Sequence, residues 1–511
     1  MSYHGIIFSL KHHPIARSAG AHRIATVLRQ EGWDCEVIDH SRLWTLDQLK
    51  ELVQSRVTSK TIFIGFSVFF NYWEVKFDQL VDWLKIEYPN IKTIIGGQSV
   101  ALTPAKHIDY WVDSFGEVAI VELLKHLTGN SGTLVKFDFN YLGKKKLIKS
   151  ISAYPAYPLE SYASRLEKRD FLKPYEWLTT EFSRGCKFSC DFCNFPILGV
   201  KGDYSRSQSD FEQEMKYNHD EWGITDYYVA DETFNDSTEK IRKFADVAEK
   251  LPFKPYFSGF MRGDLLLSHR ESWPELIRLG FGGQYYGIES FNHKAAKTIG
   301  KGMKAEKLKA GLIEYKEYMK DKLFYRGTIS LIVGLPYETV ESMRETEEWL
   351  LNNWTDQSLI SFPLDVGSTT NDYHTGQTNI SEFTRNLIKY GIRPMNIDKL
   401  ARPENWNNMP KPYAKNVMTK VNDDELMIWE HDTMNLPQAI EISKRIVDLS
   451  YDQFKLANWS LGMISFERHQ HILDIPDAAD YGYYNAQKPD ENRLQSFLKE
   501  YIINKLNWKP E

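Results

Sequence analysis

The sequence predicts an α/β protein with two successive parallel sheets and a mainly helical C-terminal extension. Three observations lead to this prediction. Strand-like and helix-like segments alternate over residues 1–128, the alternation stops over residues 129–175, and it resumes over residues 176–369. Strands that alternate with helices at this spacing form parallel sheets with helical crossovers. Residues 370–511 lack the alternation and form the predicted extension.

The first region contains five strand-like segments separated by amphipathic helical segments. Two of the strands are almost continuously apolar, as in a parallel sheet that is covered on both faces. The sequence TLDQ at Thr45–Gln48 has the pattern of a capping box that opens one of the helices. We therefore predict a Rossmann-like open sheet over residues 1–128. Its strands are expected at residues 5–10, 35–40, 61–70, 92–97 and 110–115.

The second region contains six β/α units, which predict a partial or full parallel barrel of the TIM type. Residues 129–175, rich in turn-forming residues, are expected to be a linker with one hairpin. The strands of the barrel are expected at residues 177–183, 224–230, 255–260, 283–289, 325–334 and 359–364.

Composition excludes several classes of protein. The 511 residues include 42% hydrophobic and 26% charged residues and carry a net charge of -6, which argues against a general nucleic-acid binder. No stretch approaches the ~20 apolar residues of a membrane helix, and the start MSYHGIIFSLKHHP has no secretory signal pattern. We therefore expect a cytoplasmic chain without a membrane span, whose thiols stay reduced.

Three of the four cysteines lie in the segment SRGCKFSCDFCNF, at Cys186, Cys190 and Cys193. This spacing could mark one face of a helix, but the segment follows a strand and opens with Arg-Gly. A structural zinc ion is usually bound by four protein ligands in two pairs. The sequence has no second Cys or His pair with the spacing that such a site requires. A redox dithiol would leave Cys186 unexplained. Three thiolates suit a [4Fe–4S] cluster that keeps one iron open for another ligand.

The CxxxCxxC spacing, with Phe192 before the last cysteine, resembles the signature of the radical S-adenosylmethionine (SAM) superfamily. The resemblance continues through the strand-end motifs ADETFN, MRGDLL, YGIES and LIVGLPYE. It implies that Asp231 or Glu232 contacts the SAM amino group and that Glu289 lies near its ribose and methionine. Gly334 would border the adenine.

That resemblance leaves some positions open. The second-strand motif reads Ala-Asp-Glu where the family often has Gly-Gly-Glu, so Asp231 and Glu232 remain alternatives. Arg262 and Arg326 could each pair with a carboxylate of SAM or substrate, or be structural.

Small residues end the strands of the first sheet, where ligands bind in open α/β folds. An open sheet of this kind before a radical SAM core resembles the cobalamin-binding domain of cobalamin-dependent radical SAM enzymes. The resemblance implies that Ser67, Gly96 and Gly97 border the dimethylbenzimidazole tail. The DxHxxG motif that supplies an axial histidine is absent; His12 or His13 lies nearby in SLKHHPIARSAG.

Together these resemblances imply an enzyme that cleaves SAM to a 5′-deoxyadenosyl radical and, with cobalamin, methylates an unactivated carbon. Cyclisation or rearrangement without methyl transfer is the first alternative, and a cobalamin or Fe–S sensor is the second. A flavodoxin- or ferredoxin-like reductant is implied. The C-terminal extension is expected to cover the barrel mouth, and no motif identifies the substrate.

Overall fold

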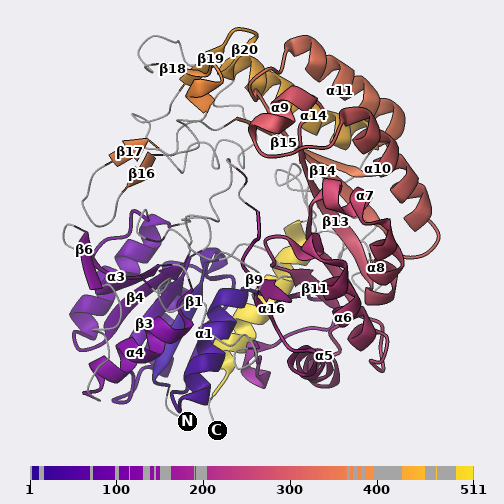
Figure 1. Ribbon diagram of the computed structural model, residues 1–511. Coiled ribbons are helices and arrows are strands. Elements are labelled where there is room, and N and C mark those ends of the chain that lie inside the picture. The colour runs from indigo at the N-terminus through magenta and orange to yellow at the C-terminus, as the bar shows by residue number, and fades with distance from the viewer. Residues whose placement is uncertain are drawn as a thin grey trace.

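The computed structural model contains a seven-stranded sheet and a six-stranded sheet, each flanked by helices (Figure 1). It describes residues 3–10, 17–68, 73–97, 100, 103–113, 115–129, 139–142, 145–149, 163–188, 190, 204–364, 369–371, 378–380, 387–395, 428–454, 468 and 491–509.

The first sheet has the strand order β2-β1-β3-β4-β5-β7-β6, and all neighbours except the hairpin β6–β7 are parallel. The hairpin lies in the stretch expected to connect the two sheets and extends the first one. The strands are β1 (Gly5–Ser9), β2 (Cys35–Ile38), β3 (Phe63–Ser67), β4 (Lys92–Gly97), β5 (Tyr110–Asp113), β6 (Phe139–Leu142) and β7 (Lys145–Lys149).

Helices cover both faces of this sheet because side chains on each buried strand alternate between two apolar cores. Ile7 joins one core with α1 (Ala19–Gln30) and α4 (Glu117–Leu127), whereas Ile6 and Phe8 join the other. The second core also contains residues of α2 (Leu46–Arg56), α3 (Val75–Glu87) and the C-terminal α16 (Glu491–Asn507). The capping box predicted at Thr45 is present: its hydroxyl accepts from Gln48 N at 3.2 Å.

The second sheet is parallel throughout, with the order β8-β11-β12-β13-β14-β15. It confirms the predicted α/β class and the six-unit partial barrel. Its strands are β8 (Leu178–Thr180), β11 (Asp226–Val229), β12 (Tyr256–Met261), β13 (Phe281–Glu289), β14 (Arg326–Val333) and β15 (Ser358–Pro363). The helices between them include α5 (Gln208–Trp222), α6 (Thr238–Ala248), α8 (Trp273–Leu279), α10 (Ala305–Met319) and α11 (Val340–Asn353).

The C-terminal extension divides between the two sheets. Helix α14 (Leu436–Phe454) packs against β15, the last strand of the barrel sheet. Strand β19 (Ile428–His431) lies nearby, and the indole N–H of its Trp429 donates to Leu364 O at 2.8 Å. Helix α16 instead returns to the first sheet (Figure 1). Among the described residues, the extension therefore covers one side of the barrel end and also braces the N-terminal sheet.

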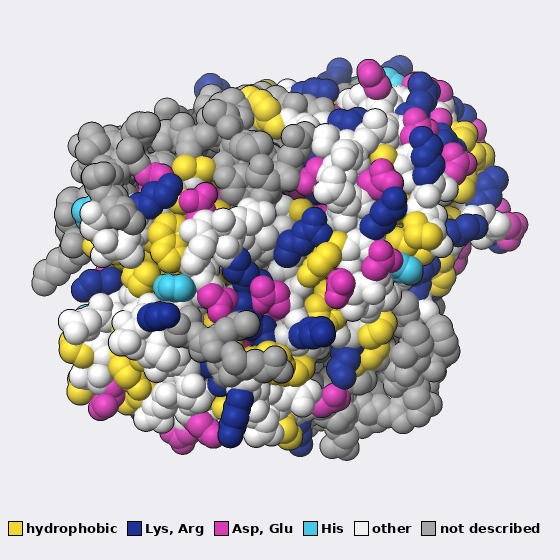
Figure 2. All heavy atoms as spheres, turned by 90° about the horizontal axis from the view of Figure 1, so that it is seen from below, with side chains coloured by type: hydrophobic (Ala, Val, Ile, Leu, Met, Phe, Trp, Pro, Cys, Tyr) yellow, Lys and Arg dark blue, Asp and Glu magenta, His cyan; other side chains and the backbone are white. Residues whose placement is uncertain are grey.

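Acidic and basic side chains are interspersed on the described part of the face that Figure 2 shows, so basic side chains do not gather there. A membrane-crossing helix is not found among the described helices, none of which is both long and apolar enough.

Candidate cofactor-binding site

The cysteine loop begins directly after the first barrel strand. Strand β8 leads to the short β9 (Ser183–Arg184) and then to Cys186, whose Sγ lies 3.5 Å from Thr233 Oγ1 in the loop after β11. Cys190 Sγ accepts a hydrogen bond from Arg262 Nη1 at 3.2 Å. The sheet thus brings both described thiols to its carboxyl edge, where parallel folds bind ligands. Cys193 and Phe192 lie outside the described residues.

Arg262 is fixed beside Cys190 by two further contacts. Its guanidinium donates to both carboxylate oxygens of Asp264, at 3.0 and 2.7 Å, and stacks over Phe188 at 4.2 Å. Burial disfavours the charged guanidinium, but Asp264 and Cys190 together raise the pKa of Arg262. The result is a fixed positive charge that donates a hydrogen bond to the Cys190 sulfur.

Arg326, the other candidate arginine, occupies a different place. It begins β14, and its Nη1 donates to Asp356 O at 3.4 Å. Because the cysteine loop lies at the opposite, carboxyl edge of the sheet, Arg326 is not part of this site. The sequence pattern could not separate the two arginines, since both flank barrel strands.

The structure distinguishes the two acids after β11. Both oxygens of Asp231 accept hydrogen bonds at 2.8 Å, one from Phe182 N and one from the Ser183 hydroxyl. Glu232 Oε2 is buried without a hydrogen-bond partner among the described residues. Burial raises the pKa of Asp231 to about 6 and, with Asp231 and Glu181 nearby, that of Glu232 to about 8. Asp231 therefore braces the start of the cysteine loop, whereas Glu232 has an oxygen available for a cationic ligand.

Glu289 ends β13 in a left-handed conformation, with φ of 67°. Its carboxylate lies 3.7 Å from Lys301 Nζ, and burial raises its pKa despite that cation. A non-glycine residue with positive φ is uncommon and often marks a functional position.

Gly334 follows β14 with φ of 98°, and a Cβ there would lie 2.2 Å from the Trp429 ring. Glu338 accepts hydrogen bonds from Gly334 N at 2.8 Å and Leu335 N at 3.1 Å, and another from the Ser290 hydroxyl. Burial raises the pKa of Glu338 to about 7. One buried carboxyl thus ties the loops after β13 and β14 together, a role that the motif LIVGLPYE did not reveal.

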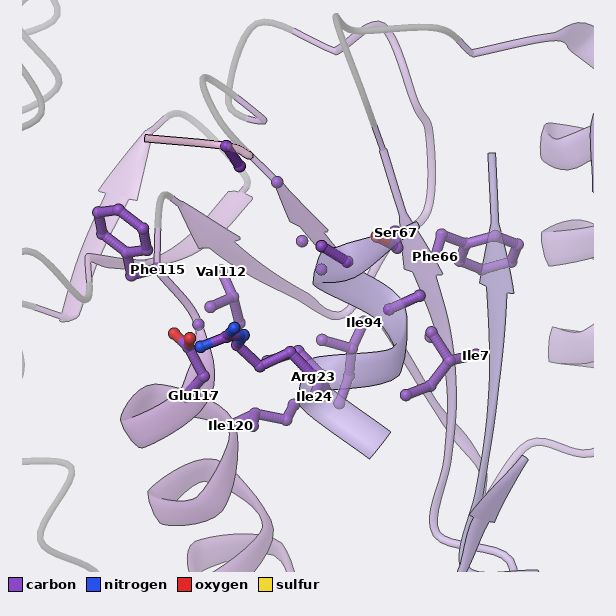
Figure 3. A pocket seen from close by; sticks show the side chains of 18 of the residues that line it. Ile7, Arg23, Ile24, Phe66, Ser67, Ile94, Val112, Phe115, Glu117 and Ile120 are labelled. Carbon is purple, nitrogen blue, oxygen red and sulfur yellow. The ribbon is translucent and has the colours of Figure 1, made fainter. Parts of the chain in front are cut away.

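A second candidate site lies at the carboxyl ends of β3 and β4 in the first sheet. Figure 3 shows apolar side chains of the sheet, α1 and α4 around this cavity, with Arg23 and Glu117 together at one side. The predicted residues Ser67, Gly96 and Gly97 all line it. The volume of the cavity is about 250 Å³. Pockets that bind a complete small-molecule ligand usually have volumes of roughly 300 Å³ or more. The cavity therefore suits one ring system of a larger ligand.

Buried ion pairs connect the cavity with the cysteine loop. Glu181 pairs with Arg23 at 2.9 Å and with Arg184, also at 2.9 Å, and Arg184 reaches Glu117 at 2.6 Å. Although burial acts to raise the pKa of Glu181, the two guanidiniums lower it to about 2. Sequence analysis missed these ion pairs because Arg23 and Arg184 are 161 positions apart in the sequence, and only folding brings the two sheets together.

Comparison with known proteins defines the class of the second sheet. Residues 180–350 match the family model described as the Radical SAM superfamily, so this part of the chain is a radical SAM domain. An uncharacterized methyltransferase from Pyrococcus horikoshii is 25% identical over 277 residues, covering 50% of this chain and 57% of that protein. The anaerobic magnesium-protoporphyrin IX monomethyl ester cyclase of Synechocystis is 25% identical over 245 residues, covering 44% and 47%. The matches therefore span about half of each relative.

Solved structures show that the fold extends over both sheets. The methyltransferase TsrM from Kitasatospora setae, with cobalamin and a [4Fe–4S] cluster bound, has a TM-score of 0.61 at 13% identity. That likeness covers 98% of this chain and 100% of TsrM. The cobalamin-dependent enzyme OxsB, with aqua-cobalamin and SAM bound, has a TM-score of 0.58 at 14% identity, covering 99% and 85%. This chain shares their arrangement of two sheets and a C-terminal region.

Proposed function

We propose that this chain is a cobalamin-dependent radical SAM methyltransferase that acts on an unactivated carbon. The observation that carries the proposal is the placement of Cys186 and Cys190 at the carboxyl edge of a radical SAM domain, with Cys190 beside Arg262. The two structural neighbours described as cobalamin-bound support the corrinoid, and the methyltransferase among the relatives supports the outcome. A flavodoxin- or ferredoxin-like protein would supply electrons.

The residues present fit an iron–sulfur cluster and SAM. Cys186, Cys190 and Cys193 would hold a [4Fe–4S] cluster, which when bound supplies the electron that cleaves SAM. The unpartnered oxygen of Glu232 would accept a hydrogen bond from the SAM ammonium, and Asp231 would keep the loop before Cys186 in place. The buried Glu289 would accept a hydrogen bond from SAM hydroxyls in the same way.

The cavity of the first sheet fits the end of a corrinoid tail. It has an apolar lining between α1 and α4, and the backbone of Gly96 and Gly97 lies open to it. The apolar lining and the glycine backbone would together hold an uncharged planar base. A bound corrinoid would supply the methyl group, and Arg23 and Glu117, together at one side of the cavity, would be available to polar groups of that ligand.

Anaerobic reconstitution tests the proposal directly. Protein loaded with iron and sulfide, then given SAM and dithionite, should form methionine and 5′-deoxyadenosine, measured by liquid chromatography and mass spectrometry. Cys190→Ala should abolish both the cluster absorbance and the product. Cys35→Ala is the matched control, because Cys35 is buried in β2 and burial raises its pKa to about 12.

The outcomes separate the alternatives. Intact SAM despite a reduced cluster would contradict an enzyme and favour a sensor. Formation of 5′-deoxyadenosine by protein that never retains a corrinoid would remove methyl transfer and favour cyclisation or rearrangement. Bound zinc without inorganic sulfide would overturn the cluster itself.

A further inference from the structure

A lysine-rich segment lies against the cysteine loop. Residues 293–309 contain six lysines and one acid, although the whole chain carries a net charge of -6. The segment comprises α9 (His293–Thr298), a short loop and the start of α10. In that loop Gly300 is exposed, and a Cβ at this position would lie 3.8 Å from Cys190 Cα. Gly300 is thus both at the protein surface and in contact with the cysteine loop.

Two of the six lysines have partners within the fold. Lys301 is buried and donates to Gly287 O at 2.6 Å. Lys309 is half-buried over the Phe291 ring. The other four lysines are exposed and make no ion pair with the described residues. We call these four the lysine patch: Lys294, Lys297, Lys304 and Lys307.

Local folding gathers the lysine patch on one part of the surface. Its two lysines on α9 are three residues apart, and its two lysines at the start of α10 have the same spacing, so each pair shares one side of its helix. The ring Nδ1–H of His293 donates to Met303 O at 3.2 Å, which holds the starts of the two helices together. Gly300 N donates to Lys297 O at 3.3 Å, so the patch borders the exposed glycine beside Cys190.

Helix stability does not account for the lysines of α10. Lys304 is the N-cap of this helix, and Lys307 lies in its first turn. The N-terminal end of a helix carries a partial positive charge, so cations there are destabilising and acids are stabilising. Local choices that work against the fold are expected at functional positions. The charges therefore indicate a contact outside the fold.

We propose that the lysine patch is the docking surface for an acidic one-electron donor protein. This inference rests on the proposed function, because it takes the cysteine loop as the holder of the cluster. One electron leaves the reduced flavin or iron–sulfur centre of the donor and enters the cluster, and no covalent bond forms or breaks. Opposite charges on the two surfaces steer the encounter and orient the donor towards the exposed Gly300 beside Cys190.

The charge of the whole chain favours a small acidic protein over a nucleic acid. A long polyanion would extend from the patch onto the rest of a chain whose net charge is -6. The acidic face of a small protein would meet the patch alone. Transient electron-transfer complexes bury small areas, which four side chains around one loop can supply.

Anaerobic stopped-flow absorbance tests the docking surface. It measures how fast a reduced flavodoxin of strongly negative net charge reduces the cluster of the reconstituted protein. Lys304→Glu/Lys307→Glu reverses two charges of the patch and places acids where the α10 dipole favours them, so the fold should hold. The rate should fall at least about 10-fold, since steering by opposite charges raises such rates by about 10-fold or more. Lys294→Glu/Lys297→Glu tests the α9 side independently and should slow the reaction similarly.

The matched control reverses two lysines at the other end of the barrel. Lys250 follows α6 and Lys254 precedes β12, so both lie at the amino edge of the sheet, and both are exposed. Lys250→Glu/Lys254→Glu changes the net charge of the protein by the same amount as each patch variant. Its reaction with the flavodoxin should stay within about twofold of the wild type, because distant exposed charges are screened by salt.

Two further measurements separate docking from damage to the cluster. Raising the ionic strength from about 0.01 M to about 0.1 M shortens the Debye length from about 30 Å to about 10 Å. This change should slow the wild-type reaction more than the reactions of the two patch variants. Photoreduced 5-deazariboflavin, a small reductant without net charge, should reduce the cluster at the same rate in all four proteins.

Each unexpected result contradicts the inference in its own way. Wild-type flavodoxin rates in both patch variants would overturn the docking surface. Slow reduction by 5-deazariboflavin as well would show that the substitutions damage the cluster site, and would also overturn it. RNA binding by the wild type that both patch variants lose, at unchanged flavodoxin rates, would assign the patch to a nucleic acid instead.

Failure of this inference is distinguishable from failure of the proposed function. Protein that cleaves SAM to 5′-deoxyadenosine with 5-deazariboflavin, but shows no effect of the patch variants, retains the proposed function and loses the docking surface. Protein whose cluster is reduced through the patch, but which never cleaves SAM, retains the docking surface and loses the proposed function.

Discussion

At the scale of single residues, Glu232 combines a buried unpartnered oxygen with a pKa of about 8. At pH 7 the free protein therefore holds this carboxyl mostly protonated. A bound ammonium group favours the ionised form, so binding should expel the proton. The neighbouring Asp231 cannot take this role without losing the hydrogen bond that it accepts from the backbone N–H of Phe182.

Calorimetry measures that proton. Titration of SAM into unreduced protein at pH 7, in buffers of different ionisation enthalpy, should show release of close to one proton per SAM. Glu232→Gln should release none and bind about 10-fold more weakly, and wild-type affinity should increase as pH rises towards 8 because ionising Glu232 then costs less. Proton release that persists in Glu232→Gln would contradict the assignment.

Arg262 acts at the same scale on the other side of the cysteine loop. Its hydrogen bond to Cys190 Sγ and its positive charge favour the more negative, reduced state of a cluster held there. Arg262→Gln should therefore lower the reduction potential by on the order of tens of millivolts. Redox titration followed by electron paramagnetic resonance measures the shift, and Arg326→Gln should leave the potential unchanged.

At the scale of elements, helix α1 forms one wall of the cavity in the first sheet. Gly20 lines the cavity, and a Cβ at this position would meet only Ser67 Oγ, at 3.6 Å. A larger side chain can therefore enter the cavity without moving the helix backbone. Leucine also gains helix propensity over glycine, by roughly 0.8 kcal/mol.

Gly20→Leu should consequently fill the cavity while the fold stays intact. Protein purified from cobalamin-fed cells should carry stoichiometric corrinoid absorbance in the wild type, and at least about 10-fold less in Gly20→Leu. Gln30→Leu adds the same side chain at an exposed position of α1 and should leave corrinoid content unchanged. Full corrinoid content in Gly20→Leu would place the corrinoid elsewhere.

At the scale of the whole molecule, helix α16 joins the C-terminus to the first sheet. Lys505 is fully buried, and its Nζ lies 3.1 Å from Glu36 Oε1, 2.8 Å from Val37 O and 3.7 Å from Asp170 Oδ1. The Tyr501 hydroxyl accepts from Asp39 N at 2.9 Å. These contacts link the first sheet, the segment before β8 and the C-terminus through one charged side chain.

Removal of that charge tests the link. Lys505→Met keeps the apolar stem but leaves buried carboxylates short of a cation, and should lower the free energy of unfolding by about 3 kcal/mol. Lys499→Met, at an exposed position of α16, should change it by less than about 0.5 kcal/mol. Urea unfolding followed by circular dichroism compares the two, and equal stability of both variants would show that the buried charge of Lys505 does not stabilise the packing of α16 on the first sheet.

The sequence by itself determined the two parallel sheets and the position of the cysteine loop. Both follow from local information: strand and helix periodicity, and the spacing of Cys186, Cys190 and Cys193 within eight residues. Ser67, Gly96 and Gly97 were also predictable as strand ends, and the structure places all three at one cavity. The assignment of ligands to these residues remains a proposal.

Only the tertiary structure decided which of several similar residues face the site. Asp231 and Glu232 are adjacent in sequence, yet the fold satisfies one carboxyl and leaves an oxygen of the other unpaired. The fold likewise places Arg262 against a thiol, Arg326 at the opposite end of the barrel, and α16 on the first sheet. The physical reason is that burial and pairing arise from contacts between segments far apart in the chain, which periodicity and spacing do not record.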